Sequence, residues 1–273
     1  MMRFIRRLYR HIHWRWLFGR AQKHRTQREA RVVRQRWQRR IRWGVRVVLL
    51  LLALDAFYLI HIWPDWQRFE HGPIARSNFI TQYEQQSRND RSLPRLQWQP
   101  VKLNNISPHV LRAVIIGEDA RFYYHSGFDV IALKEAMDYN LDKWKFKYGA
   151  STISQQTVKN MFFSASRDPL RKWHELIFTI GMEFKVNKKR ILETYLNIAE
   201  FGVGIFGVEA AAQHYWQTSA KYLSPLQAAQ LAACLPGPKR HNPKTNTVFY
   251  NKRVNKIMRF MALQMSATGH HTE

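Results

Sequence analysis

The chain has 273 residues, of which 44 are Lys or Arg and 19 are Asp or Glu, so its formal net charge is +25. This charge excludes an ordinary neutral cytosolic enzyme, and a hydrophobic content of 45% excludes a low-complexity chain. The single cysteine, Cys234, excludes an internal disulfide and a cysteine-based zinc site. The charge is concentrated at the start, because residues 1–46 hold 16 Lys and Arg against one acid, Glu29.

Residues 45–63, VRVVLLLLALDAFYLIHIW, form an apolar run close to the roughly 20 residues that a helix needs to cross a bilayer. Asp55 within this run costs about 2.5 to 3.5 kcal/mol in hydrocarbon, so a buried core helix is the alternative. The basic segment before the run and the tryptophans near its ends favour a transmembrane helix. By the positive-inside rule, the N-terminus then lies in the cytoplasm and the chain after residue 64 lies outside it.

The basic tail, residues 1–44, has candidate partners of two kinds. Its arginines could contact anionic lipid, or they could bind nucleic acid; the third possibility is charge that is merely solvated. The neighbouring apolar run would bring the tail within a Debye length of lipid headgroups, which favours membrane lipids. We therefore expect no nucleic-acid partner.

The rest of the chain divides by composition. Residues 64–100 are polar and contain four prolines, which predicts a spacer with at most one or two short elements. In residues 101–265 apolar residues recur at helical spacing, which predicts an almost entirely helical domain. Residues 266–273 are expected to be a polar C-terminal tail.

The first candidate site is EDARFYYHSGFD at 118–129, which follows a helix predicted to begin at Ser107 and Pro108. The spacing of Glu118 points it toward the apolar side of that helix. Partial desolvation and the negative C-terminus of the helix would raise its pKa, as a general base requires. The alternative is a structural carboxylate bonded to the turn. We expect His125 to brace this turn rather than to transfer protons.

The second candidate site is GASTISQQTVKN at 149–160, where Gly149 and Ser151 suit a turn and a helix cap. Its many neutral hydroxyls and amides suit a sugar or a diphosphate. The alternative is a surface helix, although the apolar residues between them indicate that much of this helix is buried.

The third candidate site opens at Asp168 and Pro169, a predicted helix start. Arg171 and Lys172 then stand in the first turn, where cations are unfavourable but where, with free backbone amides, they can bind an anion. We therefore expect that replacing both cations leaves stability unchanged or slightly higher. The alternative is that Glu175 simply pairs with Arg171. Glu183 is a weaker candidate on a similar face.

These segments together resemble a known family. The blocks are EDxxFxxHxGxD at 118–129, GxSTxxQQxxKN at 149–160, RKxxE at 171–175 and KKRILExYLN at 188–197, followed by FG at 201–202. In this order they resemble the peptidoglycan glycosyltransferases that polymerise lipid II, the lysozyme-like family found in bifunctional penicillin-binding proteins. Residues 197–213 and 223–238 resemble its monofunctional biosynthetic transglycosylases. The similarity spans roughly 103–245, with Ala150 and Asn187 where relatives often have Gly and Ser.

The resemblance implies a mainly α, lysozyme-like glycosyltransferase domain with a smaller membrane-associated lobe and one N-terminal transmembrane helix. It implies that Glu118 is the general base of an inverting reaction and that Glu175 acts near the leaving diphosphate. The expected diphosphate-binding cations are Lys159, Arg171 and Lys172. Sugar contacts or support are expected from Gln156, Asn160, Asp119 and Ser151, and structural support from His125, Phe122 and Gly127.

The resemblance also implies the setting of the reaction. The substrates would be lipid II and the growing glycan chain, at the bacterial inner membrane, with the catalytic domain outside the cytoplasm. No metal-ligand spacing is recognisable, so any Mg²⁺ would be held mainly by substrate diphosphate. No Ser is followed three residues later by Lys, so crosslinking would fall to partner transpeptidases or cell-division proteins. A lytic enzyme that cleaves glycan strands and a membrane-tethered basic binding protein remain the alternatives.

Overall fold

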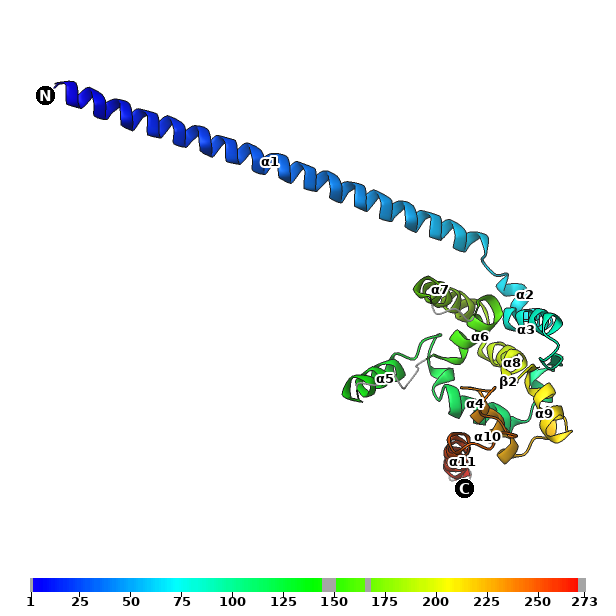
Figure 1. The fold of residues 1–273 in the computed structure, drawn as a ribbon. Coiled ribbons are helices and arrows are strands. Elements are labelled where there is room, and N and C mark those ends of the chain that lie inside the picture. Colours follow the sequence, from blue (N-terminus) through cyan, green and yellow to red (C-terminus); the bar gives the residue numbers. More distant parts are fainter. Residues whose placement is uncertain (1, 144–150, 165–167, 270–273) are drawn as a thin grey trace. The chain divides into compact units, whose positions relative to one another are not determined.

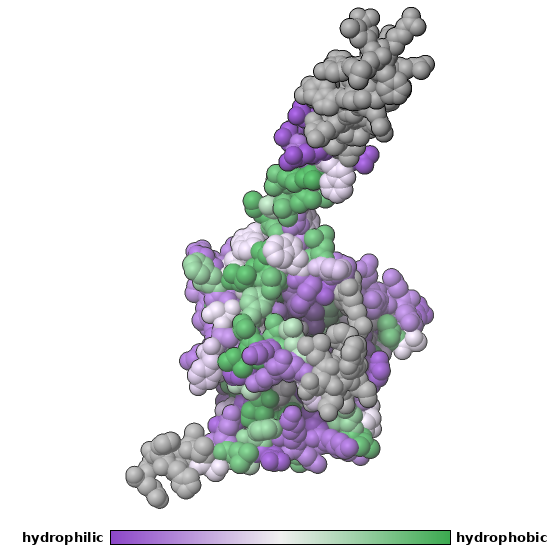
Figure 2. Space-filling view, turned by 90° about the vertical axis from the view of Figure 1, so that its left-hand side faces the viewer, coloured by the Kyte–Doolittle hydropathy of each residue, from purple (hydrophilic) through white to green (hydrophobic). Residues whose placement is uncertain are grey.

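A computed structural model of the chain describes residues 2–143, 151–164 and 168–269. The chain divides into two units, and the division falls between Trp63 and Pro64. The first unit is one helix, α1 (Met2–His61), drawn in blue in Figure 1. Its most apolar window has a mean hydropathy of 2.1, and only 6% of that window is buried. Figure 2 shows this window as a green stretch next to hydrophilic residues. Helix α1 is therefore not a core helix of this protein, and its length and composition suffice to anchor the chain in a membrane.

The second unit begins earlier than the sequence analysis predicted. Residues 64–100, expected to be a spacer, contain α2 (Trp66–His71), α3 (Asn78–Asn89) and the short strand β1 (Gln97–Trp98). The side chains of Ile80 and Tyr83 are buried in one cluster with Ile198 and Phe206. The prediction failed because it rested on composition. The segment is rich in Gln and Arg, and only a few apolar residues anchor it to the rest of the unit.

The C-terminal part of the unit is built on α4 (Pro108–Glu118), α10 (Pro225–Cys234) and α11 (Val248–Gly269), which pack together (Figure 1). Helix α10 approaches α4 closely because small side chains line it: Ala228, Ala229, Ala232 and Ala233 are all fully buried. Helix α11 continues through Gly269, so residues 266–269 are helical rather than part of a polar tail.

A second group of helices lies in the middle of the chain. Helix α6 (Ile153–Phe162) packs against both α7 (Pro169–Lys185) and α8 (Lys188–Ile198). The N-terminus of α7 is capped by Asp168, as predicted. The N-cap of α6 is Thr152, which forms a capping box with Gln155, so the prediction of Ser151 as the cap was wrong by one residue. Gly149, predicted to form the turn, lies outside the described residues.

A small sheet interrupts the otherwise helical domain. Strands β2 (Glu200–Gly202) and β3 (Ile205–Phe206) pair antiparallel, and β3 pairs in parallel with β1, giving the order β1-β3-β2. Helix α9 (Val208–Trp216) follows. Gly204 turns between the strands with φ +75°, and a Cβ there would stand 2.5 Å from the Tyr83 hydroxyl. The sheet thus attaches the segment after α3 to the end of α8.

Two helices of the second unit expose apolar side chains. Helix α5 (Val130–Lys143) and helix α7 contribute Val130, Ile131, Leu133, Met137, Leu170, Trp173, Ile180 and Phe184, all exposed. Soluble surfaces seldom carry so many large apolar residues on neighbouring turns. These helices fit the expected membrane-associated lobe.

Candidate active site

Glu118 is the last residue of α4, and its side chain is 10% exposed. One carboxylate oxygen accepts a hydrogen bond from Gln156 Nε2 at 2.8 Å, and the other accepts from Arg253 Nη2 at 2.6 Å. Burial raises the pKa of Glu118, and Arg253 and Gln156 oppose that rise by favouring the ionised form. The result is an oriented, partly desolvated carboxylate, as expected of a general base.

Two residues that hold Glu118 were missed by sequence reasoning. Arg253 on α11 also donates to the backbone carbonyl of Gly117 at 2.7 Å, so it fixes both the carboxylate and the end of α4. The Tyr195 hydroxyl on α8 donates to Gln156 Oε1 at 3.0 Å, which leaves the amide nitrogen to face Glu118. These contacts join positions far apart in the chain, and nothing in the local sequence pattern points to them.

The first turn of α7 holds a compact charge cluster. Glu175 is 2% exposed and accepts from Arg171 Nη1 at 2.7 Å and from Lys172 Nζ at 2.5 Å. The pairing that we kept as the alternative is therefore present, and it includes both cations. The two cations outnumber the one carboxylate, so the cluster as a whole carries a net positive charge. It can therefore still attract an anion at this helix N-terminus.

Lys159 on α6 interacts electrostatically with the carboxylates of both Glu118 and Glu175. Burial lowers the pKa of Lys159, and Arg171 and Lys172 lower it further, while Glu175 and Glu118 raise it. Among the described residues, its amine makes no hydrogen bond or close ion pair. A partly desolvated amine that both acids influence suits an incoming anionic group.

The 119–129 loop is held by Asp119 and His125. The Asp119 carboxylate accepts from His125 Nε2 at 2.9 Å and from the backbone N–H of Ile153 at 3.0 Å, which ties the loop to the start of α6. Gly127 has φ +91°, and a Cβ there would stand 2.8 Å from Thr179 Cγ2. Phe122 in the same loop is fully buried, so these residues hold the loop against the rest of the domain.

The remaining predicted residues fall into different surroundings. Asn160 is almost fully buried, whereas Ser151 is exposed at the start of the α6 segment. Glu183 accepts from Ser154 Oγ and from Lys188 Nζ, the latter at 2.7 Å, so it braces α6 and α8 against α7. Neither Asn160 nor Glu183 is brought to Glu118 by a described contact.

The acids near Glu118 do not form a ready metal site. Asp119, His125 and Asp129 offer ligand atoms within 4.8 Å of one another. However, Arg121 binds both oxygens of Asp129 at 2.8 and 2.9 Å, and Asp119 is already shared by His125 and a backbone amide. A cation there would have to displace a guanidinium, so these groups fit a structural network better than a metal centre.

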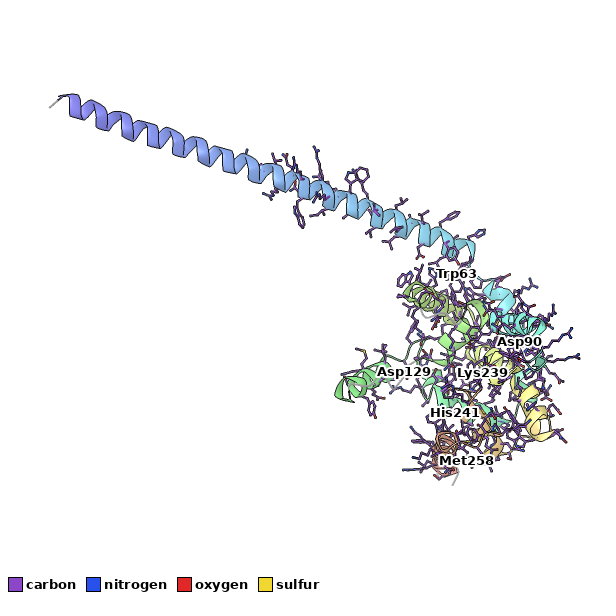
Figure 3. All side chains as sticks on the ribbon, in the orientation of Figure 1. Trp63, Asp90, Asp129, Lys239, His241 and Met258 are labelled. Atoms are coloured by element: carbon purple, nitrogen blue, oxygen red, sulfur yellow. The ribbon has the colours of Figure 1, made fainter. Side chains whose placement is uncertain are left out.

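A cavity of about 540 Å³ opens beside Glu118. Residues of α4, α5 and α11 line this cavity. Asp129, labelled in Figure 3, also lines it and directly precedes α5. Its polar lining includes Glu118, Arg121, Glu135, Ser151 and Lys256. This volume is within the range of small-ligand pockets and is large enough for a sugar unit.

The sequence of this chain is similar to a defined set of proteins. A family model described as Transglycosylase matches residues 86–262. The biosynthetic peptidoglycan transglycosylase of Nitrosospira multiformis is 39% identical over 225 residues, covering 81% of this chain and 96% of the relative. The protein of the same name from Laribacter hongkongensis is 38% identical over 228 residues, covering 82% of this chain and 99% of the relative. Matches of this extent show that the chain belongs to the transglycosylase family.

Proposed function

We propose that this protein polymerises lipid II into linear β-1,4-linked glycan strands of peptidoglycan. The relatives bear the name biosynthetic peptidoglycan transglycosylase, and they match most of this chain. The proposal specifies the substrate and assigns the chemistry to two groups of residues, one around Glu118 and one around Glu175.

In the proposed reaction Glu118 removes the proton from the 4-hydroxyl of the acceptor GlcNAc. The freed oxygen attacks C1 of the MurNAc at the reducing end of the growing chain. The bond from C1 to the diphosphate breaks as the new bond forms, and undecaprenyl diphosphate leaves with the electron pair. Attack from the opposite side inverts the anomeric centre. Arg253 and Gln156 hold the carboxylate ionised and oriented for this proton transfer.

The departing diphosphate requires neutralisation, which we assign to Lys159, Arg171 and Lys172. Cationic donors to a developing anion act most strongly in a desolvated site. Glu175 holds Arg171 and Lys172 in place through contacts to both of its oxygens. Because these oxygens are occupied, they do not fit a resident metal ion. Any divalent cation such as Mg²⁺ would therefore be held mainly by the substrate phosphates.

The proposal rests on a buried, oriented carboxylate, Glu118, and on a partly desolvated cation, Lys159, whose pKa is raised by both Glu118 and Glu175. A lytic enzyme acting on finished glycan strands needs the carboxylate but has no diphosphate to neutralise. The cations therefore favour the transferase.

We place the protein in the inner membrane as a single-pass protein with its N-terminus in the cytoplasm and its second unit outside. Helix α1 supplies an anchor of sufficient length. The charge asymmetry of the sequence supports this orientation. Lipid II and the growing glycan chain would be its substrates, and partner transpeptidases or cell-division proteins would carry out crosslinking.

The test is incubation of the detergent-solubilised protein with labelled lipid II. We expect a polymer that muramidase digests to disaccharide units, together with released undecaprenyl diphosphate. A parallel reaction supplies isolated glycan strands instead. Cleavage of those strands with no polymer from lipid II would contradict the transferase and establish the lytic alternative.

A further inference from the structure

The basic tail is not used by the proposed reaction, and most of it lies outside the match to the Laribacter hongkongensis relative. The Laribacter hongkongensis protein is matched over 99% of its length, yet that match covers only 82% of this chain. Because the family model reaches residue 262, few of the unmatched residues can follow it. The additional segment is therefore largely the Arg-rich N-terminus.

The part of the tail next to the apolar run has two unlike sides. Residues 31–46 contain seven arginines and no acid. Trp37, Ile41 and Val45 are four residues apart, so they share one side of α1 and lead directly into the apolar run. Arg39 and Arg46 fall on the opposite side, although Arg34 stands on the apolar side and Trp43 on the arginine side. All seven side chains are exposed, and Trp37 is 64% exposed.

This pattern is typical of a helix that lies at a membrane interface. The apolar side would meet the acyl boundary while the arginines meet lipid phosphates. A helix that bound nucleic acid through its arginines would gain nothing from an apolar side continuous with a membrane-spanning run. Charge complementarity and this continuity thus favour anionic lipid as the occupant.

The distance along the helix decides whether the whole segment can reach the headgroups. At 1.5 Å per residue, Trp37 lies about 10.5 Å before Gly44 along a straight helix. The Debye length at physiological salt is about 8 Å, so arginines before Trp37 would be screened if the helix continued straight into water. Gly44 stands at the boundary, and no atom lies within 4 Å of the position its Cβ would take. Glycine also weakens a helix at this point.

In this structure α1 continues through Gly44. We propose that at an anionic lipid surface residues 31–43 turn at Gly44 and lie along that surface, at the N-terminal end of the membrane span. Trp37 and Ile41 face the acyl chains, and the arginines contact lipid phosphates. The segment thereby adds a lipid-dependent contact to the membrane anchor.

The structure allows a selective label for the test. The native thiol, Cys234, is fully buried, and burial raises its pKa to about 12, so it reacts poorly. In the full-length protein, Trp37→Cys places an environment-sensitive fluorophore on the apolar side. Gln35→Cys is the matched control, because it places the same fluorophore two residues earlier, about 160° around the helix from position 37 and on the arginine side. Both proteins are reconstituted in nanodiscs of phosphatidylcholine alone or of two parts phosphatidylcholine to one part phosphatidylglycerol.

We expect an aqueous quencher to act several-fold less on the label at position 37 in nanodiscs with phosphatidylglycerol than in those without it. The label at position 35 should remain accessible in both. High salt, or the triple substitution Arg36→Gln, Arg39→Gln and Arg42→Gln, should abolish the protection.

Three outcomes would overturn the proposal. Equal quenching at positions 37 and 35 in both lipids means that the tail extends into water. Equal protection in neutral and anionic nanodiscs means that anionic lipid is not the partner. Shielding of both labels by added RNA or duplex DNA, in place of the effect of phosphatidylglycerol, means that the tail binds nucleic acid. No substrate is used, so the result is independent of the proposed reaction.

Discussion

Glu118 is the residue on which the proposed chemistry depends. Glu118→Gln keeps the size of the side chain and can still accept a hydrogen bond from Arg253, so we expect the fold and lipid II binding to persist. Turnover in the lipid II polymerisation assay should fall on the order of 10²-fold or more, because the amide cannot take up the proton. Burial disfavours the ionised carboxylate whereas Arg253 and Gln156 favour it, so these effects oppose each other and we expect only a small change in thermal stability at neutral pH. Polymerisation at the parental rate would make Glu118 a structural carboxylate.

Arg253 lets the ionisation of Glu118 be tested through pH. The rate should fall on acidification as Glu118 becomes protonated, and because burial raises its pKa, this fall should occur at higher pH than for an ordinary Glu. Arg253 opposes that rise. Arg253→Gln should therefore shift the acid limb of kcat to still higher pH, and Arg253→Lys should restore part of the shift.

Stability supplies the second measurement for the Arg253 variants. With the pKa of Glu118 raised further, its neutral form is favoured in the folded state, so the stability it contributes is present at low pH and is lost as pH rises through the folded-state pKa. The melting temperature of Arg253→Gln should therefore drop relative to the parent as pH rises. An acid limb identical to that of the parent would show that Arg253 does not govern the base.

At the scale of one element, the N-terminus of α7 corrects an expectation drawn from sequence. Cations in a first helical turn suggested that Arg171→Gln with Lys172→Gln would leave stability unchanged. The structure shows instead that both cations pair with the buried Glu175. Removing the partners of a buried charge costs about 3 to 5 kcal/mol, and the 47% exposure of Lys172 places this case toward the lower end.

We therefore predict that the double variant melts at a clearly lower temperature and loses polymerisation. The matched control adds Glu175→Gln to the double variant, which removes the unpaired charge and should recover much of the stability. Polymerisation should stay low in this triple variant, because the cations that face the diphosphate are still absent. A stable triple variant with parental turnover would show that the cluster is only structural.

Local signals explain which elements could be predicted from the sequence. Ser107 before Pro108 and Asp168 before Pro169 mark helix starts because caps and first-turn prolines act within a few residues. Glu118 could be placed on the inner side of its helix by spacing alone. The partners Arg253 and Tyr195 could not, because α8 and α11 approach Gln156 and Glu118 only through tertiary packing. The small sheet could not be predicted either, because each strand has only two or three residues and is too short to show an alternating pattern.

For the whole molecule, the sequence indicated an anchor and a helical catalytic domain, but not where the folded unit begins. A continuous apolar run identifies residues 45–63 within α1, and apolar periodicity identifies the helices after residue 101. It does not reveal α3, whose anchoring residues Ile80 and Tyr83 are few and become buried only against residues of α8 and β3. Contacts between distant segments set this boundary, so composition alone placed it too late.

The arrangement of charge around α1 makes the last prediction one of topology. Residues 1–46 hold 16 Lys and Arg against one acid. Because basic segments that flank a membrane span stay in the cytoplasm, we expect the N-terminus to lie there. A reporter that is active only outside the cytoplasm should work when fused after Glu273 and fail when fused to the N-terminus. A reporter active only in the cytoplasm, fused at the same two ends, is the control and should give the reverse pattern. Activity of the first reporter at the N-terminus would reverse the orientation, and it would leave Glu118 on the side of the membrane away from exported lipid II.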